Sequence, residues 1–264
     1  TGDIRTAKGV WSSGGNLVVP RKQMAGSGIQ NAALATGGSQ INYGNAYTEC
    51  SEEYNGTAWT EGNNLPAGRA FHGGTGTQTA ALSFGGNDGD GANSNVTAEY
   101  GGTSWTAGGN LNTARRRFDG AGTLTAGLGF GGYTDTSVNN SEEYNGTSWT
   151  AGGTMSVGKN GAFGFGTLTA GVVTGGEVGG GAKSTLTQLY DGTTFSTSPA
   201  TPATGRMSGT AAGTSSAGQI ISGSPSGTLT EEFTISLTAT TGAAWELVDI
   251  PEDLKEISEK YRTE

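Results

Sequence analysis

Residues 141–149 read Ser-Glu-Glu-Tyr-Asn-Gly-Thr-Ser-Trp, and residues 51–59 read Ser-Glu-Glu-Tyr-Asn-Gly-Thr-Ala-Trp. A nine-residue phrase that returns with one substitution indicates an internal repeat. Working outward from it, a tryptophan or a residue in its place recurs at intervals of 44 to 48 residues: Trp11, Trp59, Trp105, Trp149 and Phe195. Self-similarity at this period is typical of propellers and solenoids.

Three further landmarks keep the same order in the repeats. A glycine pair, degenerate in its last copy, occurs at Gly37-Gly38, Gly85-Gly86, Gly131-Gly132, Gly175-Gly176 and Ser222-Gly223. A basic residue occurs at Arg21, Arg69, Arg115, Lys159 and Arg206. An aromatic residue, usually after glutamate, occurs at Tyr54, Tyr100, Tyr144, Tyr190 and Phe233. Because four landmarks keep the same order and spacing, the repeat is not an accident of amino-acid composition.

Each repeat predicts a four-stranded antiparallel meander. Residues 124–130 alternate larger and smaller side chains with the period of a strand. Asn55-Gly56 and Asn145-Gly146 predict type I′ hairpin turns, in which both central residues have positive φ. The glycine pairs are expected where the blades approach most closely, because a Cβ atom there would collide with a neighbour.

This pattern resembles the kelch repeat over about residues 9 to 235: a basic residue opens the first strand, a double glycine ends the second, and an aromatic residue and a tryptophan follow. The resemblance implies an all-β fold, a five-bladed β-propeller of four-stranded antiparallel blades over residues 1–245. The expected blades cover about 12–59, 60–105, 106–149, 150–195 and 196–240. We expect the N-terminal strand around Val10 to Leu17 to complete the last blade and close the ring, with 234–245 as the alternative.

The repeat texture, rich in Gly, Thr, Ala and Asn, also resembles kelch-like arrays on virion proteins of tailed bacteriophages, particularly marine ones. That resemblance implies a virion, extracellular location and other virion proteins as partners. It names no catalytic motif and no cofactor.

Composition narrows the function classes. The chain of 264 residues has 23 acidic and 14 basic residues and a formal net charge of -9. This balance disfavours binding to nucleic acid or to an anionic membrane. No stretch reaches the roughly 18 apolar residues of a membrane helix. The single cysteine, Cys50, excludes an internal disulfide framework.

The segment 246–264 differs from the repeats in composition. Pro251 suits the first turn of a helix, and an apolar stripe follows on a charged background: Leu254, Ile257 and Tyr261. We expect a short C-terminal α-helix there that packs under the propeller or serves in assembly, including self-association into a homo-oligomer.

The variable stretches between the second and third strands are candidate ligand-binding loops, because repeats concentrate variation on one face. They carry the residue types that stack on sugars and bind their hydroxyl groups: Tyr43, Tyr47, Asp88, Asp90, Asn93 and Tyr133. Residues 87–93 have the oxygen-rich look of a calcium loop. They lack the distal bidentate glutamate, so we expect a turn with no metal.

The basic residues occupy the same position in each of the five repeats, so in a propeller they are expected to form a ring. They either line one mouth of the channel or pair with repeat glutamates, and we favour the structural pairing. The glutamate pairs, such as Glu142-Glu143, place adjacent side chains on opposite faces of a strand, which suits a scaffold better than joint acid–base catalysis.

Catalytic motifs are sparse. Kelch propellers include copper oxidases, but one histidine, His72, cannot supply such a site or a Ser-His-Asp triad with its nucleophile elbow. We expect His72 to be an ordinary strand residue and the chain not to be an enzyme.

These observations together predict a phage virion surface module, a tail fibre, appendage or capsid decoration, that binds a host-surface glycan or receptor or another virion protein. The alternatives are a secreted bacterial adhesin or lectin-like propeller, and a glycan-processing enzyme. The last would require a carboxylate cluster facing the channel.

Overall fold

The computed structural model describes residues 13–41, 44, 46–225 and 227–235. The chain divides into a compact unit, Thr1–Thr234, and a second unit, Ile235–Glu264. The predicted boundary at residue 245 and the predicted helix with Leu254, Ile257 and Tyr261 lie outside the described residues.

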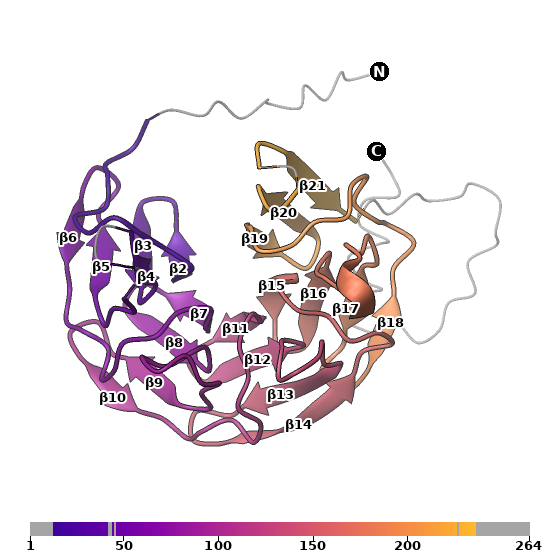
Figure 1. Ribbon diagram of the computed structural model, residues 1–264. Coiled ribbons are helices and arrows are strands. Elements are labelled where there is room, and N and C mark those ends of the chain that lie inside the picture. Colours follow the sequence, from indigo (N-terminus) through magenta and orange to yellow (C-terminus); the bar gives the residue numbers. More distant parts are fainter. Residues whose placement is uncertain (1–12, 42–43, 45, 226, 236–264) are drawn as a thin grey trace, which may run out of the picture. The chain divides into compact units, whose positions relative to one another are not determined.

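The first unit is a five-bladed β-propeller, as predicted (Figure 1). The first two blades comprise β2 (Ala25–Ile29), β3 (Ala32–Thr36), β5 (Ser51–Tyr54) and β6 (Trp59–Glu61), then β7 (Gly73–Thr77), β8 (Ala80–Phe84), β9 (Thr97–Tyr100) and β10 (Trp105–Ala107). The third and fourth comprise β11 (Asp119–Thr123), β12 (Ala126–Phe130), β13 (Asn140–Tyr144) and β14 (Trp149–Thr154), then β15 (Phe163–Thr167), β16 (Ala170–Thr174), β17 (Gln188–Tyr190) and β18 (Phe195–Thr197). The fifth has three described strands, β19 (Thr210–Thr214), β20 (Ala217–Ile221) and β21 (Thr230–Thr234).

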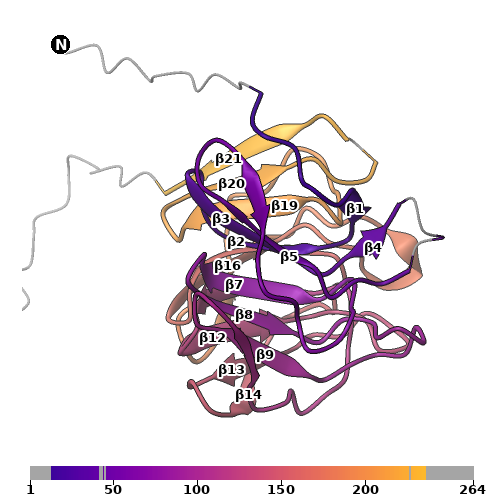
Figure 2. The ribbon, with the colours of Figure 1, turned by 90° about the vertical axis from the view of Figure 1, so that its left-hand side faces the viewer.

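Within each blade the strands pair antiparallel in chain order, so the first strand lies innermost and the last lies at the rim. The inner strands of successive blades contact each other: β2 with β7, β7 with β11, β11 with β15, and β15 with β19. A two-stranded ribbon, β1 (Arg21–Lys22) with β4 (Ser39–Gln40), projects beside the first blade (Figure 2). The one helical segment among the described residues is a 3₁₀ turn, η1 (Gly179–Gly181).

The Asn-Gly hairpins differ from the prediction of type I′ turns. Gly56 and Gly146 have φ of 91° and 90°, but Asn55 and Asn145 do not share a positive φ. Tyr144 pairs with Trp149, so the loop has four residues, and the Asn145 Oδ1 accepts hydrogen bonds from the amides of residues 147 and 148. The asparagine serves as a side-chain cap within the loop, which removes the need for two left-handed residues.

The double glycines meet two demands. Both members have positive φ, for example 62° at Gly131 and 103° at Gly132. A Cβ atom on Gly131 would also lie 2.5 Å from the carbonyl oxygen of Lys159 in the next blade. The expected collision is therefore confirmed, and the backbone conformation adds a second reason for glycine.

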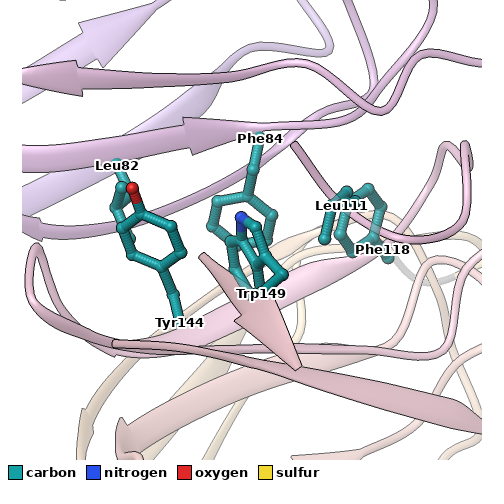
Figure 3. Close-up of a cluster of buried hydrophobic side chains, with 6 residues drawn as sticks. All are labelled: Leu82, Phe84, Leu111, Phe118, Tyr144 and Trp149. Carbon is teal, nitrogen blue, oxygen red and sulfur yellow. The ribbon is translucent and has the colours of Figure 1, made fainter. Parts of the chain in front are cut away.

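Hydrophobic clusters between neighbouring blades form the core. In the cluster of Figure 3, Trp149 packs on Tyr144 of its own blade and on Phe84 of the preceding blade, with ring centroids 5.0 and 4.9 Å apart. Its indole N–H donates to the Thr97 hydroxyl of that preceding blade at 2.9 Å. Leu111, from the connection between the two blades, completes the cluster.

In the first three blades, the glutamate directly before the aromatic landmark joins neighbouring blades. The hydroxyl groups of Tyr100, Tyr144 and Tyr190 donate to Glu53, Glu99 and Glu143 of the preceding blades. Burial, with the carboxylate as hydrogen-bond partner, raises the pKa of Tyr144 to about 12, so the phenol keeps the proton that it donates. At the junction of blades four and five, Leu189 and Phe233 replace both partners and lie in one apolar cluster.

Candidate functional site

A ring of unusual backbone lies at the entry to the inner strand of every blade. Two residues after each basic landmark, the chain adopts positive φ: 61° at Gln23, 56° at Phe71, 54° at Arg117, 58° at Gly161 and 58° at Ser208. Only one of these residues is glycine. A bulky residue such as Phe71 in this region is an outlier that costs about 1–3 kcal/mol, and such strain concentrates at functional sites.

Backbone hydrogen bonds link this ring from blade to blade. The amide of Phe71 donates to the carbonyl of Gln23 at 3.0 Å, and the amide of Arg117 donates to that of Phe71 at 2.8 Å. The amide of Gly161 donates to Arg117 at 2.6 Å, and that of Ser208 donates to Gly161 at 2.9 Å. The left-handed conformation is therefore part of the junction between blades, whatever side chain the residue carries.

The ring surrounds a central cavity of about 980 Å³. Glycines of the inner strands form much of its wall, and Lys22, Phe71, Arg117, Asp119 and Ser208 face it with functional groups. The guanidinium carbon of Arg117 lies over the Phe71 ring, 5.2 Å from the ring centroid. This volume falls within the range of small-molecule sites.

Asp119 is the one carboxylate among the described residues that line the cavity. Its carboxyl oxygens accept hydrogen bonds from the amides of Gly120, at 2.9 Å, and Gly164, at 3.1 Å. Burial raises its pKa to about 6, although these two hydrogen bonds favour the ionised form. The cavity thus contains a carboxyl group that changes charge close to neutral pH, and its lining also includes two cationic side chains, those of Lys22 and Arg117.

His72 lies directly before β7 rather than within a strand. Its Nε2 is 3.2 Å from the Thr36 hydroxyl, and burial, with Arg69 and Arg21 nearby, lowers its pKa to about 3. The imidazole is neutral at physiological pH and packs between the first two blades.

The basic ring lies inside the blades and not at the channel mouth. The side chains of Arg21, Arg115 and Arg206 pair with Glu52, Glu142 and Glu231 at 3.3, 3.1 and 2.6 Å. Where the repeat has no glutamate, the cation binds carbonyls instead: Arg69 donates to Val96 at 2.9 Å and Lys159 to Leu186 at 2.6 Å. Burial then lowers the pKa of Lys159 to about 8.

The same glutamates hold the connections between blades. Glu142 accepts hydrogen bonds from the amides of Asn112, at 2.6 Å, and Thr113, at 3.3 Å. Glu52 accepts the amides of Val18 and Val19 in the equivalent way, at 2.7 and 3.1 Å. The two residues of a glutamate pair therefore serve two different scaffold contacts, on opposite faces of the strand.

The predicted loop residues lie in a network that ties adjacent loops together. Asn93 accepts a hydrogen bond from Arg116 at 2.7 Å and donates to the Thr134 carbonyl at 2.9 Å. The Arg116 guanidinium lies 4.8 Å from the centroid of the Tyr133 ring, and the Tyr47 hydroxyl lies 3.5 Å from the Asn87 amide nitrogen. Tyr47, Asn93 and Tyr133 therefore contact residues of neighbouring loops. Their role in ligand binding stays a prediction.

Asp88 and Asp90 are not held together as a pair of ligands. The Asp88 carboxylate accepts the amides of Asp90 and Ala92 at 3.1 and 3.0 Å, which closes a turn, and Asp90 is exposed. Among the described residues, no group of three or more His, Cys, Asp or Glu side chains could hold a metal. Tyr43 lies outside the described residues.

The channel residues were not predicted from the sequence. Residues 115–117 look like one short basic run, yet Arg115 pairs with Glu142, Arg116 covers Tyr133, and Arg117 faces the cavity. One feature of the sequence could have pointed to the channel. Asp119 is a charged residue at the first position of an inner strand, where the other repeats have uncharged residues: Ala25, Gly73, Phe163 and Thr210.

Comparisons with known proteins identify the fold. No protein-family profile matches the sequence, and no curated protein matches it. Among solved structures, one described as "Structure of YjhT" superposes with a TM-score of 0.66 over 81% of this chain and 80% of that one, at 15% sequence identity. The chain shares its β-propeller fold with YjhT.

The likeness to YjhT contradicts the prediction that the chain is not an enzyme. That prediction depended on the missing copper ligands and catalytic triad and on the lack of a carboxylate cluster facing the channel. The structure places one carboxyl group, that of Asp119, in the lining of the cavity, with its pKa raised to about 6. Separately, no helix in the described part of the chain has the length and apolar character of a membrane span.

Proposed function

We propose that this chain is a recognition module that binds an acidic glycan in the central channel of the propeller, on the surface of a phage virion. The observation that carries this proposal is the cavity whose lining combines Phe71, Arg117 and Ser208. An aromatic face and nearby hydrogen-bonding groups suit a sugar ring. Two cations, Lys22 and Arg117, against the single carboxyl of Asp119 favour a sugar with a carboxylate or other anionic group.

The virion setting extends this proposal beyond the cavity. Its support is the resemblance of the repeats to kelch-like arrays on tailed-phage proteins, together with a net charge of -9, which suits a soluble external module. The expected partners are other virion proteins and a glycan of the host surface. Nucleic acid and membrane insertion are not part of the proposal.

The test is binding to a glycan array and to intact candidate host cells, with three single variants. Arg117→Asn removes one of the two channel cations, and asparagine suits the left-handed backbone. We expect at least a tenfold loss of affinity, since a hydrogen bond to a charged group is worth about 1.5–3 kcal/mol. Lys183→Ala removes an equal charge from a loop ion pair and should leave binding unchanged. Binding that survives Arg117→Asn but is lost in Tyr133→Ala would move the site to the loops and refute the channel proposal.

Glycan processing is the second candidate function, and Asp119 favours it. A buried carboxyl with a pKa of about 6 can donate or accept a proton near neutral pH. Because hydrolysis of a glycosidic bond commonly uses two carboxyl groups, a single one suits a proton transfer on a bound sugar better. Turnover of an array-positive glycan that is lost in Asp119→Asn, with a pH profile that inflects near 6, would establish this candidate. Unchanged sugar after prolonged incubation, followed by NMR, would eliminate it.

A further inference from the structure

The junction between the first and second blades is more polar than the junction between the second and third. At the second of these junctions, aromatic rings pack around Trp149 (Figure 3). At the first, smaller or more polar residues stand at the equivalent repeat positions: Thr36 for Phe84, His72 for Phe118, Ser83 for Gly129 and Ala98 for Glu142. The basic residue of the second blade, Arg69, therefore has different neighbours from those of Arg115 in the third.

Arg69 is a buried cation without a carboxylate partner among the described residues. It is 3% exposed, and its one hydrogen bond to a described residue runs from Nη1 to the Val96 carbonyl at 2.9 Å. Its equivalent, Arg115, donates to two carbonyls and to Glu142, each at 3.1 Å. Since a guanidinium group presents several N–H donors in a fixed fork, Arg69 retains donors that its equivalent uses for the glutamate.

The charge of Arg69 requires a counter-ion. Burial lowers its pKa to about 10, so the guanidinium remains charged at neutral pH. A buried charge without a partner is costly, and arginine does not relieve that cost by losing its proton. Lys159, the other basic residue without a glutamate, has this second route, because burial lowers its pKa to about 8. The second blade therefore needs a negative charge that its own repeat does not supply.

Ser83 lies beside the position that the glutamate has in other blades. It is directly opposite Ala98 in the strand ladder, and opposite residues of antiparallel strands share one face of the sheet. Ser83 is 0% exposed, and its hydroxyl oxygen has no hydrogen-bond partner among the described residues. The Nδ1 atom of His72 is likewise buried and unpartnered. Because buried polar groups are normally hydrogen-bonded, these groups indicate a polar occupant.

We propose that a small monovalent anion binds at this junction, between Arg69 and Ser83, where the other three arginine-bearing blades have a glutamate carboxylate. The inference is independent of the proposed function in the channel. Compared with glutamate, Ala98 lacks the Cγ methylene and the carboxylate, which together have the composition of acetate. Ser83 is larger than its equivalent, Gly129, and takes up part of that space. The site therefore suits an ion of the size of formate, acetate or chloride.

A water molecule is the competing occupant. It would accept or donate a hydrogen bond at the Ser83 hydroxyl, as buried waters do. It carries no charge, so the Arg69 guanidinium would stay uncompensated. An anion satisfies both groups, and its hydrogen bonds to a guanidinium are of the stronger, charge-assisted kind.

Anion binding predicts a thermal unfolding midpoint that depends on anion concentration. A ligand that binds only the folded chain should raise the midpoint by about 3–6 °C for each tenfold increase above its dissociation constant. The full chain is titrated separately with sodium formate, sodium acetate and sodium chloride, with sodium sulfate holding the ionic strength constant. The salt that acts at the lowest concentration identifies the preferred ion. No dependence on any of the three, as a water molecule predicts, would overturn the proposal.

A double variant supplies the carboxylate from the chain itself. Ser83→Ala with Ala98→Glu reproduces the pair Ala35 and Glu52 of the first blade. It should unfold at a higher temperature than the unmodified chain without added anion, and it should lose the response to the three salts. Gln188→Glu, the matched control, places a carboxylate at the same position of the fourth blade and should keep the response. An equal response in the double variant and the unmodified chain would refute the site.

Ser83→Ala alone tests the hydroxyl. It should require a roughly tenfold higher anion concentration for the same rise in midpoint, because it removes one hydrogen bond to a charged group. An unchanged concentration dependence would contradict the placement of the anion beside Ser83.

Bromide locates the site without any substitution. Anomalous diffraction from a crystal of the unmodified chain, soaked in sodium bromide, should show a peak within contact distance of the Arg69 guanidinium and the Ser83 hydroxyl. Bromide found only beside Lys22 and Arg117 in the channel, or only on the outer surface, would overturn the proposal.

Discussion

The buried pair of Arg115 and Glu142 allows a quantitative test of what holds a blade together. The two side chains are 0% and 2% exposed, and the Arg115 Nη2 lies 3.1 Å from the Glu142 Oε1. Glu142 also accepts hydrogen bonds from the amide and side chain of Asn112, at 2.6 and 2.8 Å, and from the amide of Thr113. Replacing Glu142 by alanine would leave a buried guanidinium without its counter-ion and would remove these three hydrogen bonds, although the Asn112 side chain keeps its bond to the Trp149 carbonyl at 3.1 Å.

We expect Glu142→Ala to lower the free energy of unfolding by about 3–5 kcal/mol, the usual loss when one partner of a buried pair is removed. This is a large share of the roughly 5–15 kcal/mol that stabilises a typical domain. Urea denaturation followed by circular dichroism measures it, with an unchanged slope as the sign that the unfolded state is unaffected. Glu177→Gln breaks the exposed pair with Lys183, in which both side chains are about one-quarter exposed, and should cost at most about 1 kcal/mol.

The neighbouring blades make the outcome informative. The repeat has Ala98 and Gln188 in place of the glutamate, and there Arg69 and Lys159 bind backbone carbonyls. If Glu142→Ala costs less than about 1 kcal/mol, Arg115 is held by the carbonyls of Gly131 and Asn140 alone. The ion pair would then not be the stabilising contact, and the reasoning would be refuted.

Three further changes test the channel, the glycine pair and the hairpin loop. The pKa of Asp119 is about 6 in the folded protein, against the ordinary 3.8, so the folded protein binds a proton more tightly than the unfolded chain does. The free energy of unfolding should therefore fall by up to about 3 kcal/mol as pH rises from 3.8 to 6. Urea titrations at several pH values measure this slope, and Asp119→Asn should abolish it. Gly131→Ala, at φ 62° and with its Cβ 2.5 Å from the Lys159 carbonyl oxygen, should cost at least about 2 kcal/mol by thermal denaturation, whereas Gly89→Ala, which has open space, should cost little; equal losses would contradict the steric argument. Asn145→Ala removes two side-chain hydrogen bonds from an exposed loop and should cost about 1 kcal/mol, so no measurable change would show that the loop holds its shape without the cap.

The blade count and strand order follow from the sequence because each landmark has a local physical cause. Glycine is required where φ is positive and the next blade's backbone is close, as at Gly131, and tryptophan fills the space between blades, as Trp149 does. Because these causes act within each repeat and its neighbour, they recur at the same positions in every blade. The hairpin type was wrong because the Asn145 side chain replaces a backbone conformation, and an Asn-Gly pair fits both solutions.

The partners of the basic residues could be predicted only as a type of contact. Arg115 and Glu142 are far apart in the chain and are brought together by the folding of the blade. Aligning the repeats shows why Lys159 has no carboxylate partner, because its repeat has Gln188 where the third repeat has Glu142. The predicted loop residues illustrate the opposite difficulty. Tyr133 and Asn93 have the side chains of a sugar site, but both contact Arg116, which stacks on one and hydrogen-bonds to the other.

The channel ring escaped prediction for a reason that bears on function. Its five positions hold Gln23, Phe71, Arg117, Gly161 and Ser208, which share a backbone conformation and no side-chain type. The amides and carbonyls form the junctions between blades, so the backbone is fixed by the fold while each side chain is free to differ. A repeat protein that must keep its scaffold and change its ligand would vary such positions first. By this argument, exchanging the residues at 71 and 208 (Phe71→Ser with Ser208→Phe) should leave the unfolding midpoint nearly unchanged and alter the set of glycans bound; an unfolded product would show that the side chains, too, belong to the scaffold.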